Sequence, residues 1–134
     1  MEKRFPRDVQ KLHEVFDFIT GFCATTDVPE GTAVQVELIV EELFTNMIKY
    51  NLEGQHDISV QLSRQGRTLE IRVTDFDVHD FDITRAPEVD ITRPASERAV
   101  GGLGIQLVKR VADGISYAYE NRNSTITAVK RLED

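Results

Sequence analysis

The chain has 134 residues, the size of one compact domain, and its 40% hydrophobic and 29% charged residues are typical of a globular protein. Its 16 basic and 23 acidic side chains give a net charge of -7, which argues against nucleic-acid partners and against docking on an anionic membrane. One cysteine excludes an intrachain disulfide, and the absence of a signal-like or spanning apolar run predicts a single cytoplasmic domain over residues 1–134.

Two helices are expected first. Apolar residues at helical spacing predict a helix over about residues 7–23, after Pro6. Thr32 and Gln35 fit a capping box, which predicts that a second helix begins there. This second helix runs to about residue 50 and places five apolar residues on one face: Val36, Ile39, Val40, Leu43 and Met47.

Strands follow in adjacent pairs. Alternating apolar residues around 58–62 and 69–73 predict a β-hairpin. Residues 76–99 lack periodicity, and a loop of this length in a small domain is usually functional. Next comes a glycine cluster, which is followed by a predicted third helix through Val108. A second predicted hairpin, around residues 115–130, completes the chain. This order predicts an α+β two-layer sandwich, with a mixed, mainly antiparallel sheet and helices on one face.

The second helix carries the first candidate site. Glu42, Asn46 and Lys49 are spaced i, i+4 and i+7, so they form one polar stripe beside the apolar face. A carboxylate and an amide there suit Mg²⁺ held partly through water. The alternative is an ordinary amphipathic helix whose polar face is solvated.

A cluster of aspartates provides the second candidate. Asp75 stands where a strand ends, and its carboxylate could accept hydrogen bonds from an amino group. Asp77, Asp80 and Asp82 follow. Turn chemistry is the alternative, since Asp favours strand ends, and the spacing lacks the Gly and distal Glu of an EF-hand.

The third candidate is the glycine cluster "VGGLGIQLVKR" at residues 100–110. Glycines at a helix start let backbone N–H groups approach an anion, which the helix dipole also favours. The spacing is neither a Walker A loop nor a Rossmann fingerprint. A flexible hinge is the alternative.

Taken in order, these three features resemble the GHKL superfamily of ATP-binding domains. Within it, the chain is similar to the anti-sigma regulatory factors that are serine/threonine protein kinases. "EELFTNMIKY" resembles the N box of that family, and "GGLGIQLVKRVADGISYAYENRN" resembles its second glycine box with the following strand. The resemblance covers nearly the whole chain.

The resemblance implies a set of roles. Asn46 would be the Mg²⁺ ligand, Glu42 the general base, and Asp75 the acceptor for the adenine amino group. Residues 84–99 would form the ATP lid, and Lys49 stands where many members have His. Further nucleotide contacts are implied for the glycine box and the last strands: Gly101, Gly102, Leu103, Gly104 and Thr125.

The resemblance also implies partners. The phosphate acceptor would be a STAS-domain anti-anti-sigma factor, with a sigma factor as second partner, and the chain would form a homodimer. One residue departs from the family pattern: where the first glycine box reads D-x-G, this chain has Asp75-Phe76-Asp77. An added charge beside the base would weaken ATP binding if buried and unpaired. The alternatives are a protein-binding module with a degenerate nucleotide site, and an ATPase or sensor-kinase fragment with another partner.

Overall fold

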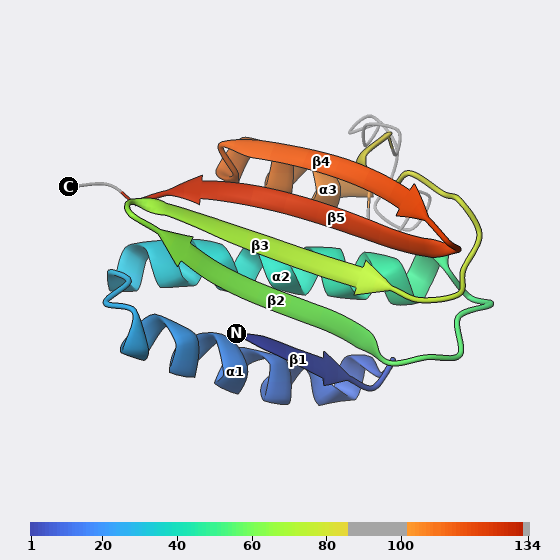
Figure 1. The fold of residues 1–134 in the computed structure, drawn as a ribbon, viewed down its shortest axis with the longest axis horizontal. Helices are drawn as coiled ribbons and strands as arrows, with labels where there is room; N and C mark the ends of the chain where they lie inside the picture. Colours follow the sequence, from blue (N-terminus) through green and yellow to red (C-terminus); the bar gives the residue numbers. More distant parts are fainter. Residues whose placement is uncertain (86–101, 133–134) are drawn as a thin grey trace.

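The computed structural model describes residues 1–85 and 102–132. In this part of the chain, three α-helices lie against one face of a five-stranded sheet (Figure 1). The helices are α1 (Leu12–Thr25), α2 (Glu30–Tyr50) and α3 (Gly102–Val111), and α2 contacts both α1 and α3. The strands are β1 (Glu2–Phe5), β2 (Ile58–Gln65), β3 (Thr68–Asp75), β4 (Gly114–Glu120) and β5 (Asn123–Arg131).

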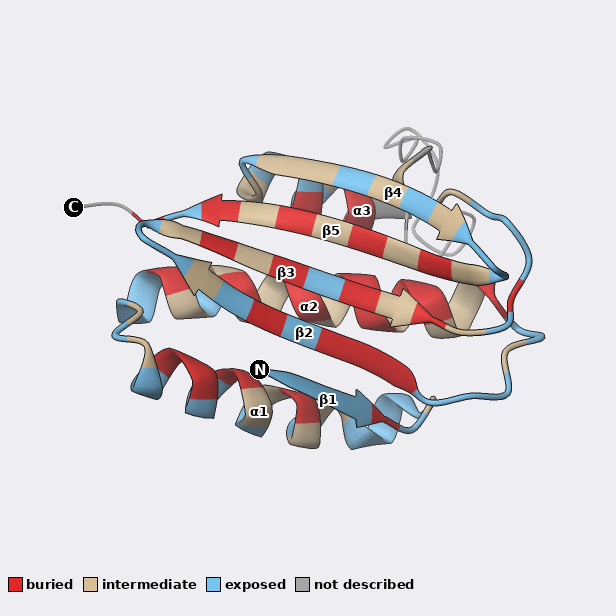
Figure 2. Cartoon of the chain, in the orientation of Figure 1, coloured by how far each residue is buried: buried red, intermediate tan, exposed pale blue. Residues whose placement is uncertain are grey.

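The strand order is β1-β2-β3-β5-β4, and every pairing is antiparallel. The predicted α+β sandwich is therefore confirmed, although the sheet has no parallel pair among the described strands. Burial alternates along β3 and β5, because successive side chains point to opposite faces of a sheet (Figure 2). The inward side chains meet the apolar face of α2 in one core, which includes Val36, Leu43, Ile71, Val73 and Ile126.

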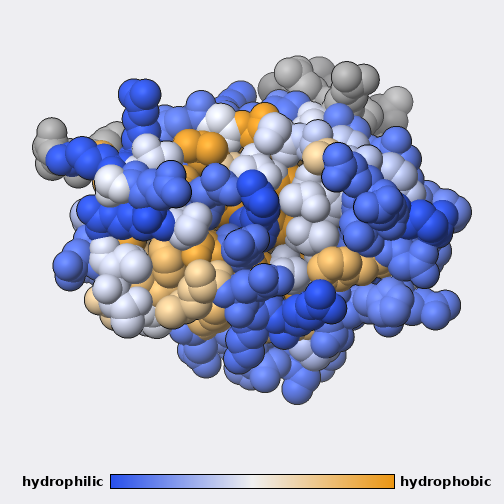
Figure 3. All heavy atoms as spheres, viewed as in Figure 1, coloured by the Kyte–Doolittle hydropathy of each residue, from blue (hydrophilic) through white to orange (hydrophobic). Residues whose placement is uncertain are grey.

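The outer face of the sheet is not covered by any described helix. Hydrophilic residues occupy most of this face, with hydrophobic residues between them (Figure 3). Exposed side chains such as Gln61, Ser63 and Arg72 project from it. None of the described helices has the length and apolar character needed to span a bilayer.

The N-terminal region differs from the sequence-based prediction. Strand β1 was not predicted, because only Phe5 of its four residues is buried and no alternation is visible. After Pro6, Asp8 caps a short 3-10 helix, Val9–Lys11, by accepting from the Gln10 N–H at 3.0 Å. Helix α1 therefore begins at Leu12 rather than near residue 7.

The start of the second helix was also placed wrongly. The chain reverses at Asp27, which has a φ of 55°, and α2 begins at Glu30 after Pro29. Thr32 lies inside the first turn of α2, so it does not form a capping box with Gln35. The helix nevertheless ends at Tyr50, as predicted.

Candidate functional site

The polar stripe of α2 lies at a buried edge of the helix layer. Asn46 is only 1% exposed, and Glu42 and Lys49 are half-buried. Among the described residues, neither Asn46 Nδ2 nor Lys49 Nζ has a hydrogen-bond partner, although Lys49 Nζ lies 5.0 Å from the Tyr50 ring centroid. Buried donors of this kind are costly, so a solvated helix face does not describe this stripe.

Burial changes the ionisation of two of these groups. The pKa of Glu42 is raised, first by burial of its carboxylate and then by the nearby charge of Glu41. Burial also lowers the pKa of Lys49. A carboxylate that is harder to ionise is a better proton acceptor, which suits a general base.

Gly104 brings the start of α3 against this stripe. A β-carbon built at Gly104 would overlap Glu42 Oε2 and lie 2.6 Å from Glu42 Cδ. No side chain larger than hydrogen therefore fits at this position unless Glu42 moves. The Glu42 carboxylate, which lies where a β-carbon of residue 104 would be, gives a physical reason for a glycine inside α3, where glycine is unfavourable by about 1 kcal/mol.

Asp75 ends β3 on the inward face of the sheet and is fully buried. Arg7 donates to its Oδ1, and Asn51 Nδ2 donates to its Oδ2 at 2.9 Å. The same guanidinium donates to the backbone oxygens of Asn51 and Met47 at the end of α2, at 2.8 and 3.3 Å. The contacts of Asp75 and Arg7 thus link the N-terminal segment, the end of α2 and the sheet.

Comparison with known proteins shows the family to which this chain belongs. The sequence profile of the histidine kinase-like ATPase domain matches residues 5–130. The chain belongs to this family.

Individual relatives support the assignment. The serine-protein kinase RsbW of Listeria monocytogenes serovar 1/2a is 30% identical over 114 residues, which cover 81% of this chain and 72% of that protein. RsbW of Listeria innocua is 29% identical, and the match again covers 81% of this chain and 72% of that protein. The crystal structure of the SiaB-SiaC complex from Pseudomonas aeruginosa matches with a TM-score of 0.67 and 16% identity, over 96% of this chain and 88% of that one. This last likeness concerns the fold alone.

Asp77, at the glycine position of the family's first glycine box, points out of the fold. Its φ is 53°, the left-handed conformation that a glycine adopts easily. Its side chain is 61% exposed and accepts from Arg122 Nε at 2.7 Å, and this hydrogen bond is the main cause of the lowered pKa of Asp77. The added charge is therefore neither buried nor unpaired.

The side chain of Thr125 does not lie on the same face of the sheet as that of Asp75. Strand register pairs Thr125 with Thr74, and their hydroxyl oxygens are 3.1 Å apart on the outer face, beside a hollow of about 190 Å³. Asp75 pairs with Ser124, which is fully buried on the inward face. Because side chains alternate between faces, the residue of β5 that shares the face of Asp75 is Ser124.

The remaining predicted residues lie at the edge of the described chain. Gly102 and Leu103 begin α3, whereas Gly101 and residues 86–99 of the expected lid lie outside the described residues. The acidic loop before them has structural contacts. Asp80 accepts from the Tyr117 hydroxyl, and Asp82 accepts from the Thr84 N–H at 2.9 Å.

The site also contains residues that the sequence patterns did not reveal. Arg7, Asn51 and Ser124 surround Asp75 but are far from it in sequence and belong to no motif. Asn51, directly after α2, is the one with a local signal, because a buried amide at a helix end needs partners.

Proposed function

We propose that this chain is an ATP- and Mg²⁺-dependent serine/threonine protein kinase that acts as an anti-sigma factor in a partner-switching system. The observation that carries the proposal is the stripe of Glu42, Asn46 and Lys49, which is partly buried and lies against the start of α3 at Gly104. The kinship with serine-protein kinase RsbW supports the reaction type.

The residues present fit the nucleotide and the metal. Asn46 offers a buried amide oxygen, a ligand type that Mg²⁺ accepts. Within residues 1–85 and 102–132, no three His, Cys, Asp or Glu side chains form a metal-binding group. Phosphate oxygens and water would complete the coordination, as is usual for Mg²⁺. When bound, ATP would supply the phosphoryl group and Mg²⁺ would neutralise part of the phosphate charge.

The chain's own groups would position and activate the acceptor. Glu42 would take the proton of the incoming serine or threonine hydroxyl, since its raised pKa makes it the stronger base. The N–H groups that begin α3, including that of Gly104, would face the phosphates, where the helix dipole favours negative charge. Asp75 would accept the adenine amino group, with Ser124 beside it.

The proposed phosphate acceptor is a STAS-domain anti-anti-sigma protein, with a sigma factor as second partner and a homodimer as the active form. The competing proposal is a protein-binding module that has lost its nucleotide site. Asp77 was the reason for it, and the outward side chain of Asp77 gives it no support.

Asn46→Leu tests the proposal. The variant removes a buried donor without a described partner, so the nucleotide-free fold is expected to unfold at the same or a higher urea concentration. Mg-ATP binding, measured by calorimetry, is expected to be lost, together with phosphate transfer to a STAS-domain protein. Gln61→Leu, on the outer face of the sheet, is the matched control and should bind normally. Absence of Mg-ATP binding by the unmodified chain at millimolar concentration would leave only the protein-binding module.

A further inference from the structure

Asp75 is held by two donors, one on each carboxylate oxygen. The carboxylate is 0% exposed, with Arg7 on one oxygen and Asn51 Nδ2 on the other at 2.9 Å. A buried carboxylate needs such partners, because an unpaired charge in the interior is strongly unfavourable. Of the roughly four lone-pair directions of a carboxylate, these two donors use two.

Arg7 is held in place by the C-terminal end of α2. Arg7 contacts the α2 backbone at Met47 and Asn51, which lie one turn apart on the same flank of α2. At about 100° per residue, Met47 lies about 100° around α2 from Asn46 and about 160° from Lys49. The backbone oxygens that hold Arg7 therefore belong to residues outside the stripe.

We propose that Arg7 is a positioning residue that fixes Asp75 as a hydrogen-bond acceptor and so makes the site select a 6-amino purine over a 6-oxo purine. This inference rests on the proposed function. A carboxylate paired with a guanidinium can only accept hydrogen bonds, and the 6-amino group of ATP donates one. The exocyclic 6-oxo group of ITP presents an acceptor to Asp75 instead, and the nearest donor of that base, its N1–H, lies one ring position away.

Gly54 allows this arrangement to be disturbed without changing Asp75 or the stripe. A β-carbon at Gly54 would overlap the Arg7 guanidinium and lie 2.6 Å from both of its terminal nitrogens. Gly54 has no positive φ, so alanine fits its backbone. Gly54→Ala therefore displaces the guanidinium, whereas Arg7→Met removes it.

The test is titration of the full chain with Mg-ATP and with Mg-ITP, reported as the ratio of the two dissociation constants. We expect the unmodified chain to prefer ATP by about tenfold or more, as one hydrogen bond to a charged group allows. In Gly54→Ala and Arg7→Met the ratio should fall toward one, mainly because ATP binds more weakly. Arg7→Lys, which keeps the charge, should retain part of the preference.

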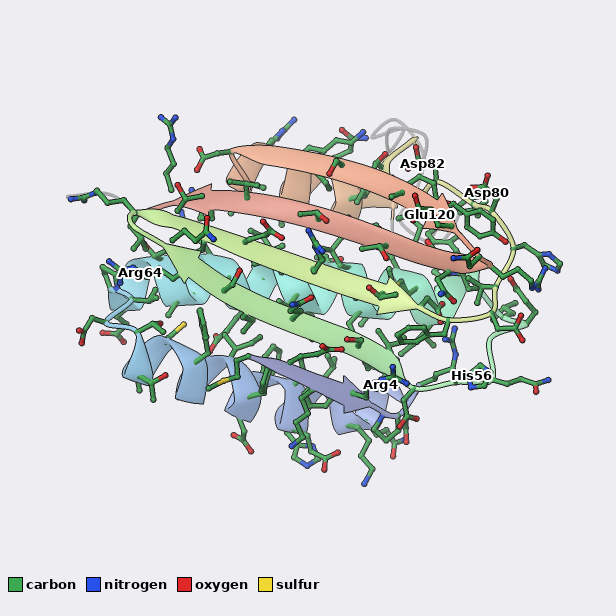
Figure 4. The ribbon with its side chains drawn as sticks, viewed as in Figure 1. Arg4, His56, Arg64, Asp80, Asp82 and Glu120 are labelled. Carbon is green, nitrogen blue, oxygen red and sulfur yellow. The ribbon has the colours of Figure 1, made fainter. Side chains whose placement is uncertain are left out.

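Arg64→Met is the control for general loss of stability. Arg64 donates to the backbone oxygen of Gly66 at 2.8 Å and also bonds that of Thr26, and it lies at the opposite end of the sheet from His56 and Arg4 (Figure 4). This variant should lower the thermal unfolding midpoint without changing the ratio. If Arg7→Met does not fold, Arg7→Met with Asp75→Leu replaces the pair by apolar groups, which is often tolerated, and should bind both nucleotides without preference.

An unchanged ratio in folded Gly54→Ala and Arg7→Met would overturn the inference and leave the proposed function standing. Equal weakening of ATP and ITP would do the same, because it is what a purely structural role of Arg7 predicts. If the unmodified chain binds neither nucleotide, the proposed function fails and this inference fails with it.

Discussion

Replacing Gly104 by alanine tests the contact between α2 and α3 on which the candidate site depends. At an open helix position this change stabilises a protein by about 1 kcal/mol. At Gly104 the new β-carbon would overlap Glu42 Oε2 and lie 2.6 Å from Cδ and 3.4 Å from Cγ. The contacted atoms are the tip of a flexible, half-buried side chain that can shift, so the cost should lie at the low end of about 1–3 kcal/mol and the net effect should be close to neutral.

A double-mutant cycle isolates the contact. In a Glu42→Ala background the two overlapped atoms, Oε2 and Cδ, are absent, so Gly104→Ala should stabilise the fold by about 1 kcal/mol. The difference between the two backgrounds predicts a coupling energy of about 1 kcal/mol. Urea unfolding of the four proteins, fitted to a two-state transition, measures it.

Gly21 in α1 is the matched control, because a β-carbon there meets nothing within 4 Å. Gly21→Ala should stabilise both backgrounds equally, by about 1 kcal/mol. If Gly104→Ala also had the same effect with and without the Glu42 side chain, the two helices would not meet in this register. Glu42, the proposed general base, could then not lie at the start of α3.

Two further predictions concern single carboxylates. Burial of the carboxylate, and after it the charge of Glu41, raise the pKa of Glu42 above its ordinary value of 4.5. The contribution of Glu42 to folding stability is therefore fully present below pH 4.5 and is lost as the pH rises through the raised pKa. Glu42→Gln should therefore be at least as stable as the unmodified chain at pH 7 by urea unfolding, with the gap closing near pH 4, while phosphate transfer is lost; lower stability at pH 7 would contradict this. Asp77→Gly relieves a φ of 53° and loses an exposed pair with Arg122, and these two effects on stability are small and opposite in sign. Its Mg-ATP affinity should change by less than about threefold, and tenfold tighter binding would mean that Asp77 obstructs the site.

The layered fold could be predicted from the sequence because its elements are amphipathic. The apolar face of α2 and the alternation in β2 and β3 each reflect a side facing the core, so their periods are visible in the sequence. Strand β1 has three exposed residues before Phe5, and it is defined by backbone pairing with β2. Backbone pairing leaves no side-chain pattern, which is why this strand was missed.

The site was predictable only where its chemistry is local. Glu42, Asn46 and Lys49 share one helix, so their spacing alone places them on one stripe. Contacts between distant segments have no such rule. Arg7 and Asp75 are 68 positions apart, and only the folded chain brings them together. Strand register places Thr125 on the outer face and Ser124 on the face of Asp75, because a step of one residue in a strand moves a side chain to the opposite face.

The unfavourable burial of polar groups in the stripe of Glu42, Asn46 and Lys49 is the strongest reason to assign this stripe a function. Asn46 Nδ2 and Lys49 Nζ are buried without described hydrogen-bond partners, and burial opposes the charges of both Glu42 and Lys49. Each feature lowers the stability of the nucleotide-free fold, and a leucine or methionine would avoid it. Unfavourable polar groups concentrated beside a glycine whose β-carbon position is filled by the Glu42 carboxylate are expected where a polar ligand completes the structure. A ligand with phosphate oxygens and a divalent cation would satisfy the amide and the ammonium together, and ligand binding should therefore raise the unfolding temperature of this chain.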